Sequence, residues 1–477
     1  MRPFTPVDHS TAAAYPLFMG GEISPPDNRA LLGLVAFIVF IDMMGIGLIM
    51  PVTPSLIMGI ADVSIDRAAE IGGLLIFAYS IMQFIFAPVI GGLSDRFGRR
   101  PVLLLSLTLL GIDYAVMAWA PTLTWLFIGR LISGVTGATW GAANSCIADT
   151  VPPDQRGAVF GMMGGAGAAG FVFGPVIGGL AGTYNDRLPF VIACALSLGG
   201  ALAGWIILRE TLPLERRRAF TLARANPFGT LLQMMKTPLV MGCLLTVFFI
   251  QLSAQANISV WGYYGALQFG WGPLAIGLTV ALYGTTIAIT QGLLVGKAIA
   301  RFGPVMTARW SLLFGLPSYL ILAFATTTWH AIAAILIGAV TAMTFPALQE
   351  LMSNRISEDA QGELQGAIAS TISLTSIIGP LVMTSIFGMF ADNKGLYLPG
   401  APFTLAMILL AIAIAILWRT LSKHGSTQSG PPLFYCLNRL GHIVAEKAVD
   451  ASGNKSADFR NDITMRGGID SGFLCER

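Results

Sequence analysis

Two carboxylates and one arginine lie inside stretches of sequence that are otherwise apolar. Asp42 interrupts LLGLVAFIVFIDMMGIGLIMP, Asp113 interrupts PVLLLSLTLLGIDYAVMAW, and Arg130 interrupts LTWLFIGRLISGV. A charge at mid-bilayer costs about 3 kcal/mol or more, so such residues usually face a watery path for ions or substrate. Burial disfavours the charged form of a carboxyl, whereas arginine keeps its charge at any accessible pH. We therefore predict proton coupling through Asp42, Asp113 and Arg130; the alternative is a purely structural tie between helices.

A glycine-rich stretch, GGAGAAG at 164–170, has the G-x-G-x-x-G spacing that holds a dinucleotide pyrophosphate. That motif acts only after a strand, at the start of a helix, with an acid about 20 residues later. Here it lies inside the apolar run GMMGGAGAAGFVFGPVIGGL, which has no acid. These glycines instead predict close helix–helix packing in lipid. No GxxxxGK[ST] loop occurs either, which excludes an ATP-driven pump encoded in this chain alone.

The elements that position these residues are predicted from composition. The chain has 55% hydrophobic and only 11% charged residues, whereas soluble domains carry about 25% charged residues. A helix that spans a bilayer needs about 20 apolar residues. Suitable segments occur near 31–58, 71–92, 101–119, 122–146, 157–182, 189–208, 237–262, 272–297, 305–326, 329–352, 362–389 and 400–420. The prediction is an all-α membrane protein with twelve transmembrane helices.

Loop charge predicts the orientation and the organisation of the chain. Alternate loops are rich in Lys and Arg, while the opposite loops hold only Arg67, Arg187 and Lys394. Since basic loops stay cytoplasmic, both termini are predicted in the cytoplasm. The expected parts are a cytoplasmic N-terminal segment (1–29), a six-helix bundle (30–208), a cytoplasmic loop (209–236), a second six-helix bundle (237–421) and a disordered cytoplasmic tail (422–477).

The two halves repeat each other at an offset of 205 residues. Arg96-Phe97-Gly98 corresponds to Arg301-Phe302-Gly303, and Gly174-Pro175 corresponds to Gly379-Pro380. Several matches at one offset indicate duplication of a six-helix unit, and such repeats build secondary transporters with the substrate site between them. The charges are not duplicated, since Ile335 corresponds to Arg130 and Ala300 to Asp95.

Several motifs together resemble the major facilitator superfamily, and within it the drug:proton antiporters, most of all the tetracycline-resistance exporters. The stretches that carry this resemblance are FIDMMGIGLIMPVTPSL, GGLSDRFGRRPVLL, LFIGRLISGVTGA and GPVIGG. The likeness is dense from about 35 to 190 and thins in the second half. It implies the major facilitator fold.

The resemblance also implies roles for particular residues. The conformational latch of the family corresponds to Gly91, Asp95, Arg96, Gly98, Arg99 and Arg100, and its helix-five exporter motif to Gly174, Pro175, Gly178 and Gly179. In the latch, Asp95 is expected to pair with arginine and with helix dipoles across the two halves in one conformation only; a simple topology anchor is the alternative. The exporters carry an acid in helix nine, where this chain has Gly315.

Amide and aromatic side chains in QLSAQANISVWGYYG suit a planar drug with polar edges. Gln255, Asn257 and Trp261 are the predicted substrate-binding residues, while Tyr263 and Tyr264 are expected to be interface anchors. The predicted function is proton-coupled drug efflux, of tetracycline or a similar amphipathic compound, across a bacterial inner membrane. The alternative is import of a small nutrient on the same fold. We expect a secondary transporter, not an enzyme, that is a monomer in lipid without a cofactor, metal or nucleic-acid partner.

Overall fold

Every regular element that the structure describes is helical. The computed structural model describes residues 28–137, 139–151, 155–212, 214–217, 237–357, 360–392 and 395–424, and no strand occurs among them. By its contacts the chain forms two compact units, residues 1–420 and 421–477. The predicted N-terminal segment and C-terminal tail, and most of the predicted central loop, lie outside the described residues.

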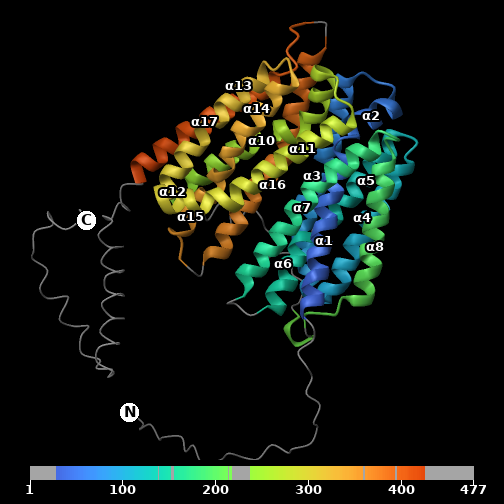
Figure 1. Ribbon diagram of the computed structural model, residues 1–477. Helices are drawn as coiled ribbons and strands as arrows, with labels where there is room; N and C mark the ends of the chain where they lie inside the picture. Colours follow the sequence, from blue (N-terminus) through green and yellow to red (C-terminus); the bar gives the residue numbers. More distant parts are fainter. Residues whose placement is uncertain are drawn as a thin grey trace, which may run out of the picture. The chain divides into compact units, whose positions relative to one another are not determined.

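The helices of the N-terminal half are drawn from blue to green in Figure 1. They are α1 (Asn28–Ile49), α2 (Thr53–Ala61), α3 (Ile65–Phe97), α4 (Arg99–Trp119), α5 (Leu123–Thr136), α6 (Thr139–Thr150), α7 (Arg156–Gly182) and α8 (Leu188–Ile207), and the short helix η1 (Leu214–Arg216) follows. Within this half, α1 packs on α7 and α8, and α4 packs on α5, α6 and α8.

The helices of the C-terminal half run from green to red. They are α10 (Pro238–Phe269), α11 (Pro273–Ile289), the π-helix η3 (Thr290–Leu294), α12 (Val295–Leu313), α13 (Gly315–Ala323), α14 (Thr328–Gly338), the 3₁₀-helix η4 (Ala339–Met343), α15 (Thr344–Ser353), α16 (Gln361–Ala391) and α17 (Ala401–His424). Here α10 packs on α16, α12 on α15, and α13 on α14.

The described helices are long and apolar enough to span a membrane. Ten helical runs meet the length and hydropathy of a membrane span, and the shorter apolar helix Leu123–Val135 accompanies them. One of the ten, Pro273–Ala323, is 51 residues long and contains two of the predicted spans. The twelve predicted segments are consistent with these helices.

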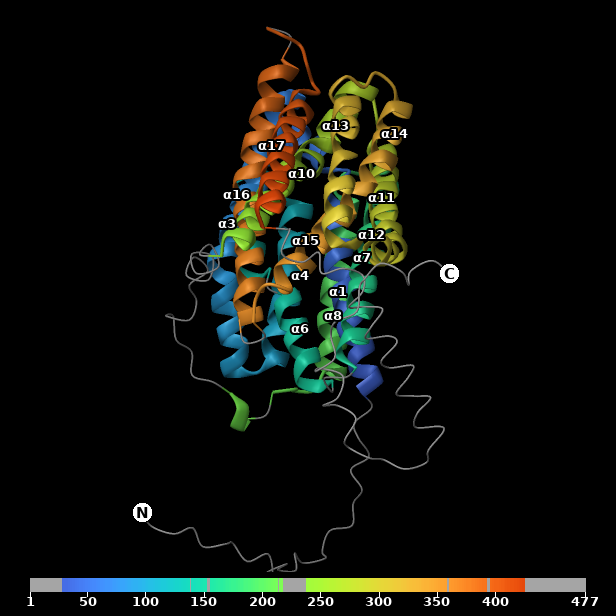
Figure 2. The ribbon, with the colours of Figure 1, turned by 90° about the vertical axis from the view of Figure 1, so that its left-hand side faces the viewer.

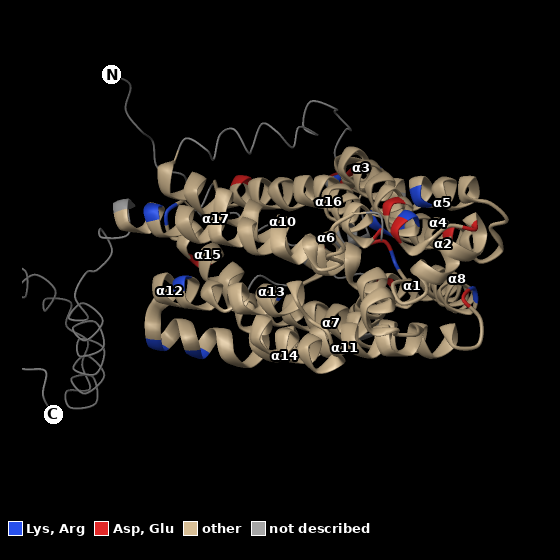
Figure 3. Cartoon of the chain, turned by 90° about the horizontal axis from the view of Figure 1, so that it is seen from above, with Lys and Arg blue, Asp and Glu red and all other residues tan. Residues whose placement is uncertain are grey.

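The surface supports the same conclusion. Large apolar side chains such as Leu105, Phe173, Leu202 and Ile206 are exposed, and Figure 3 shows that most of the residues in the helices are neither acidic nor basic. Extensive exposed apolar area marks contact with another apolar phase. The protein is therefore an integral membrane protein.

Three predicted spans are interrupted in the structure. The first, predicted over 31–58, divides into α1 and α2. Pro51 and Pro54 lie at the division, and proline lacks the N–H that a continuous helix needs. The fourth, predicted over 122–146, is interrupted at Gly137, between α5 and α6. The ninth, predicted over 305–326, is interrupted at Phe314, between α12 and α13.

The backbone repeats at the predicted offset where the second and third predicted spans of each half meet. Gly98, between α3 and α4, has φ 107° and ψ 163°, and Gly303, inside α12, has φ 75° and ψ 162°. Residues that carry a Cβ rarely adopt a positive backbone φ, so glycine is needed at both sharp turns. Gly98 and Gly303 are 205 residues apart in the sequence.

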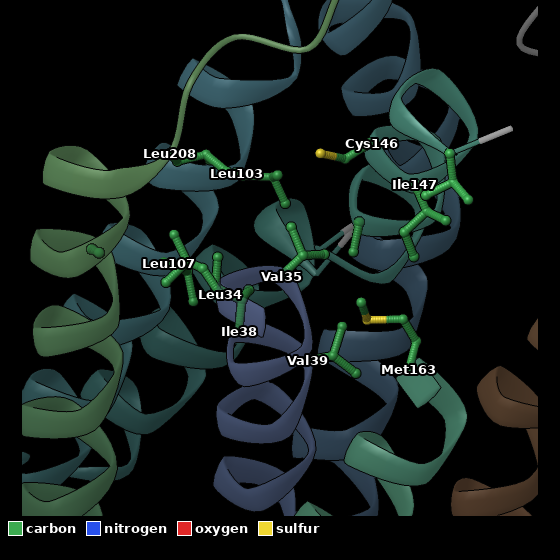
Figure 4. Close-up of a cluster of buried hydrophobic side chains, with 13 residues drawn as sticks. Leu34, Val35, Ile38, Val39, Leu103, Leu107, Cys146, Ile147, Met163 and Leu208 are labelled. Carbon is green, nitrogen blue, oxygen red and sulfur yellow. The ribbon is translucent and has the colours of Figure 1, made fainter. Parts of the chain in front are cut away.

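One end of the N-terminal half is held by a cluster of buried apolar side chains, shown in Figure 4. Val35 and Ile38 of α1, Leu103 of α4, Ile147 of α6 and Met163 of α7 belong to it. Ala201 of α8 also belongs to the cluster. Because the cluster joins residues of α1, α4, α6, α7 and α8, these five helices are held together at this end. The cluster lies beside the predicted cytoplasmic loops.

The two halves meet along two helix pairs, α3 with α16 and α7 with α11 (Figures 1 and 2). In the first pair, Gly73 lies against Pro380 and Thr384, and Gly388 lies against Glu70. In the second, Gly179 lies against Pro273. These residues lie in the halves of the helices that are nearer the predicted outer loops.

Candidate functional site

Asp113 and Arg130 form an ion pair inside the N-terminal half. Nη2 of Arg130 on α5 donates to Oδ2 of Asp113 on α4 at 2.8 Å, and the Asp113 side chain is 0% exposed. Gly129 of α5 lies directly against Oδ1 of Asp113, where any larger residue would collide with the carboxylate. Oδ1 of Asp113 and Nε of Arg130 are buried without a hydrogen-bond partner among the described residues. The pair is thus tightly enclosed but incompletely satisfied.

Asp42 on α1 is half-buried and makes no ion pair or hydrogen bond with a described residue. Tyr79 of α3 and Tyr114 of α4 lie within the electrostatic influence of Asp42, Asp113 and Arg130. The hydroxyl of Tyr114 packs against α1 at Gly45, which is one helical turn from Asp42. The three residues predicted to couple protons therefore share one neighbourhood.

Gln83 connects this neighbourhood to the break between α5 and α6. Its Nε2 donates to the carbonyl of Gly137 at 2.9 Å and to the hydroxyl of Tyr79 at 3.1 Å. Where a helix is interrupted, backbone carbonyls lose their partners and need a side chain instead. Sequence reasoning missed Tyr79, Gln83 and Tyr114, although polar side chains inside apolar spans were a signal that could have found them.

The predicted latch residues form a charged cluster at the α3–α4 turn. Arg99 binds Asp95 (Nη1 to Oδ1, 2.6 Å) and Asp149 of α6 (Nε to Oδ2, 2.9 Å). Arg100 donates to the backbone carbonyl of Trp205 at 2.6 Å. Gly91 has open space around it, and the guanidinium of Arg96 lies 5.1 Å from the ring of Phe97. The described contacts of Asp95 stay within the N-terminal half, so a latch between the halves remains a prediction.

Glu210, which follows α8, completes this cluster. Its Oε1 accepts hydrogen bonds from the backbone N–H groups of Arg99 (2.8 Å), Thr211 (3.0 Å) and Leu212 (3.0 Å). A carboxylate at a helix N-terminus satisfies free N–H groups and favours the positive end of the helix dipole. Asp149 and Glu210 were not among the predicted site residues, and their distance from Arg99 in the sequence explains why.

The predicted helix-five exporter motif, which begins at Gly174, lies on α7 of the structure and packs against other helices on two sides. On one side, the backbone of α1 at Met44 and Leu48 lies directly against Gly174 and Gly178, so a Cβ at either glycine would collide with it. On the other side, Pro175 and Gly179 contact α11. The residues of GGAGAAG lie within α7, and no strand occurs among the described residues. Of these glycines, Gly170 lies against the backbone of α1 at Phe40 and Met44, as predicted for close helix packing, whereas Gly164 and Gly165 have open space around them.

The three predicted substrate residues lie on α10. Asn257 is half-buried, and its Nδ2 lies 3.4 Å from the hydroxyl of Tyr319 on α13. Gln255 is buried, and its Nε2 lies 3.5 Å from the hydroxyl oxygen of Ser376 on α16. Trp261 is also buried, and its Nε1 donates to Thr279 at 3.0 Å.

The expectation that Tyr263 and Tyr264 are interface anchors was wrong. Both are buried, because α10 continues to Phe269 and does not end near residue 262. The hydroxyl of Tyr264 donates to the carbonyl of Leu322 at 2.7 Å, and the hydroxyl of Tyr263 packs against Gly72 of α3. Tyr263 thus contributes to the contact between the halves.

Gly315 lies at the start of α13, with Leu410 of α17 and Thr341 of η4 directly against it. An acid at this position would meet an apolar side chain. The position therefore packs two helices together in this chain.

Comparisons with known proteins agree on one family. A model described as "Major Facilitator Superfamily" matches residues 35–380 and 243–435. The chain is 40% identical over 367 residues to "Tetracycline resistance protein, class C" of Escherichia coli, covering 77% of this chain and 91% of that protein. It is 39% identical over 399 residues to the class G protein of Vibrio anguillarum, covering 82% and 98%.

Solved structures show the same fold. A bacterial homologue of the human lysosomal transporter Spinster, in an inward-facing and occupied conformation, superposes with a TM-score of 0.71 at 18% identity, covering 86% of this chain and 100% of that one. The human organic anion transporter MFSD10 (TETRAN) gives a TM-score of 0.62 at 23% identity, covering 82% and 100%.

Proposed function

Because the chain belongs to the major facilitator superfamily, we propose that it exports tetracycline or a similar amphipathic drug in exchange for protons. The relatives at 39–40% identity are tetracycline resistance proteins. We further propose that it acts as a monomer in a bacterial inner membrane with both termini in the cytoplasm, as the distribution of loop charge favours.

The observation that carries the proposal is the Asp113–Arg130 pair, enclosed in an apolar half and next to an unpaired Asp42. A proton that binds Asp113 cancels its charge and releases Arg130. When Arg130 returns to the carboxylate, its charge favours the ionised form and so expels the proton. Such an exchange needs no cofactor, only access to opposite sides of the membrane in turn.

The contacts between the halves support an inward-open state. The close approaches of α3 to α16 and of α7 to α11 run from the predicted outer loops to the middle of α7, at Phe171. Towards the predicted cytoplasmic end of α7, by contrast, a Cβ at Gly161, Gly164 or Gly165 would meet nothing within 4 Å. In this state the drug would enter from the cytoplasm, and rocking of the halves would then expose it outside.

For the drug itself, Asn257 is the best-placed of the predicted residues. Its half-buried amide and the Tyr319 hydroxyl offer donors and acceptors to a polar edge. Gln255 and Trp261 are buried, and Trp261 already donates its N–H to Thr279. We propose that Asn257 contacts the drug while Gln255 and Trp261 hold α10 in position.

The test is tetracycline uptake into inverted membrane vesicles driven by an imposed pH gradient, with expression levels matched. Asp113→Asn and Asp42→Asn should each abolish gradient-driven uptake. Asp62→Asn is the matched control, since Asp62 is exposed after α2 with φ 53°, a conformation that asparagine also tolerates. Uphill uptake at the normal rate by the two membrane variants would refute proton coupling through these acids. Failure of the intact protein to move any drug of a broad panel would refute export.

A further inference from the structure

An arginine of the C-terminal half lies inside the membrane span with part of its guanidinium unsatisfied. Arg309 is on α12, six residues after the turn at Gly303, which corresponds to about 9 Å along a helix. Its Nε is buried without a hydrogen-bond partner among the described residues. A desolvated guanidinium N–H without a partner is costly, so an acceptor that is not part of the protein would stabilise it.

One aromatic side chain contacts Arg309, and a second arginine follows that aromatic residue on α17. Its guanidinium lies 5.9 Å from the ring of Trp418 on α17. Trp310 follows Arg309 in the sequence, Arg419 follows Trp418, and both are exposed. We name these four residues the α12–α17 patch. Figure 3 shows basic segments on both helices. Neither arginine of the patch forms an ion pair or hydrogen bond with a described residue.

The internal repeat indicates that the fold itself does not need this arginine. At the offset of 205 residues, Arg309 corresponds to Leu104. The side chain of Leu104 simply packs against Gly204 of α8. An apolar residue therefore fills the equivalent place, and the charge at 309 calls for a separate explanation.

Position and chemistry together indicate the ligand. On the predicted orientation, the turn at Gly303 and the end of α17 face the cytoplasm, so the long side chains of the patch can reach the inner-leaflet headgroups from within the span. Tryptophan is enriched at this level, and arginine extends towards it along an apolar stem. Basic sites between helices on the cytoplasmic side suit anionic headgroups, and guanidinium groups bind phosphate in a fork.

We propose that the α12–α17 patch binds the phosphate of an anionic phospholipid from the inner leaflet. Arg309 contacts the phosphate from α12, Arg419 contacts it from α17, and the two tryptophans flank the glycerol and the upper acyl chains. The lipid then links two helices of the C-terminal half. This inference rests on the membrane orientation and is independent of the drug that is carried.

The test is native mass spectrometry of the full-length protein purified in detergent and titrated with phosphatidylglycerol, phosphatidylcholine or inorganic phosphate. The intact protein should bind the first phosphatidylglycerol molecule more tightly than phosphatidylcholine. Arg309→Leu, which installs the residue of the other half, should weaken phosphatidylglycerol about fivefold. Arg209→Leu removes an exposed positive charge after α8 and is the matched control, which should bind like the intact protein.

Equal affinity for the two lipids, or an unchanged affinity in Arg309→Leu, would overturn the proposal. Inorganic phosphate that competes fully with phosphatidylglycerol would also overturn it, because the site would then recognise a soluble anion. Arg419→Gln is a second variant at an exposed position, where folding is not at risk. It should weaken phosphatidylglycerol by a similar factor, and normal binding in this variant would contradict the role of α17.

Discussion

Replacing Arg130 with glutamine removes the guanidinium that faces Asp113 and leaves its carboxylate buried without a charged partner. The Asp113 side chain is 0% exposed and the pair is 2.8 Å long, so water cannot readily take the place of the arginine. Removing one partner of a buried pair typically costs about 3–5 kcal/mol. Asp113→Asn alone leaves the opposite charge uncompensated and should cost a similar amount.

The double variant Asp113→Asn/Arg130→Gln removes both charges at once. It should be less destabilised than the sum of the single variants by about 2 kcal/mol, within the range found for directly contacting residues. The assay is equilibrium unfolding in mixed micelles, followed by the fluorescence of the nine tryptophans. Arg67→Gln is the control, because the Arg67–Glu70 pair is exposed at the surface and should not change the unfolding midpoint measurably.

Two results would contradict this reasoning. One is additivity of the single variants in the double variant, which would mean that the two side chains do not interact. The other is an intact unfolding free energy in both single variants, which would mean that neither charge is desolvated.

Three further variants test other parts of the structure. Gly174→Ala should lower both the amount of folded protein and vesicle transport, because its Cβ would collide with α1 at Met44, whereas Gly164→Ala has open space and should behave normally in the same assays. Gln83→Leu should slow transport and change its dependence on pH while the protein stays folded, because the carbonyl of Gly137 and the hydroxyl of Tyr79 lose their partner; an unchanged pH profile would count against this link. Glu210→Ala removes the acceptor of the first N–H of α4 and should lower the unfolding free energy by about 1 kcal/mol, measured as above, with Glu215→Ala as the control.

The sequence predicts the features that follow from local composition and from the repeat. Apolar run lengths predict the spans, and the match of Arg96-Phe97-Gly98 with Arg301-Phe302-Gly303 predicts where the chain repeats its turn, at Gly98 and Gly303. The need of a buried arginine for a carboxylate predicts that Arg130 has a partner. The length of a span and the pairing of a buried charge both follow from the free energy lost when polar groups enter the apolar membrane interior.

Contacts between distant segments are not encoded in a comparable local signal. Asp149 and Glu210 reach Arg99 only because α4, α6 and the segment after α8 converge. Tyr263 was expected at a helix end because a run of apolar residues does not show where a helix stops. Gln83 donates to the backbone carbonyl of Gly137, and because every residue has a backbone carbonyl, the sequence does not show which one is the acceptor.

The residues that we propose for proton coupling and the residue that we propose for drug contact lie in different copies of the repeat. Asp42, Asp113 and Arg130 all belong to the first copy, while Asn257 and Tyr319 belong to the second. If these proposed roles hold, a mutation that reshapes α10 for another drug leaves the copy that contains Asp42, Asp113 and Arg130 unchanged. Substitutions in the second copy would then alter the range of transported drugs while the proposed proton-coupling residues stay in place.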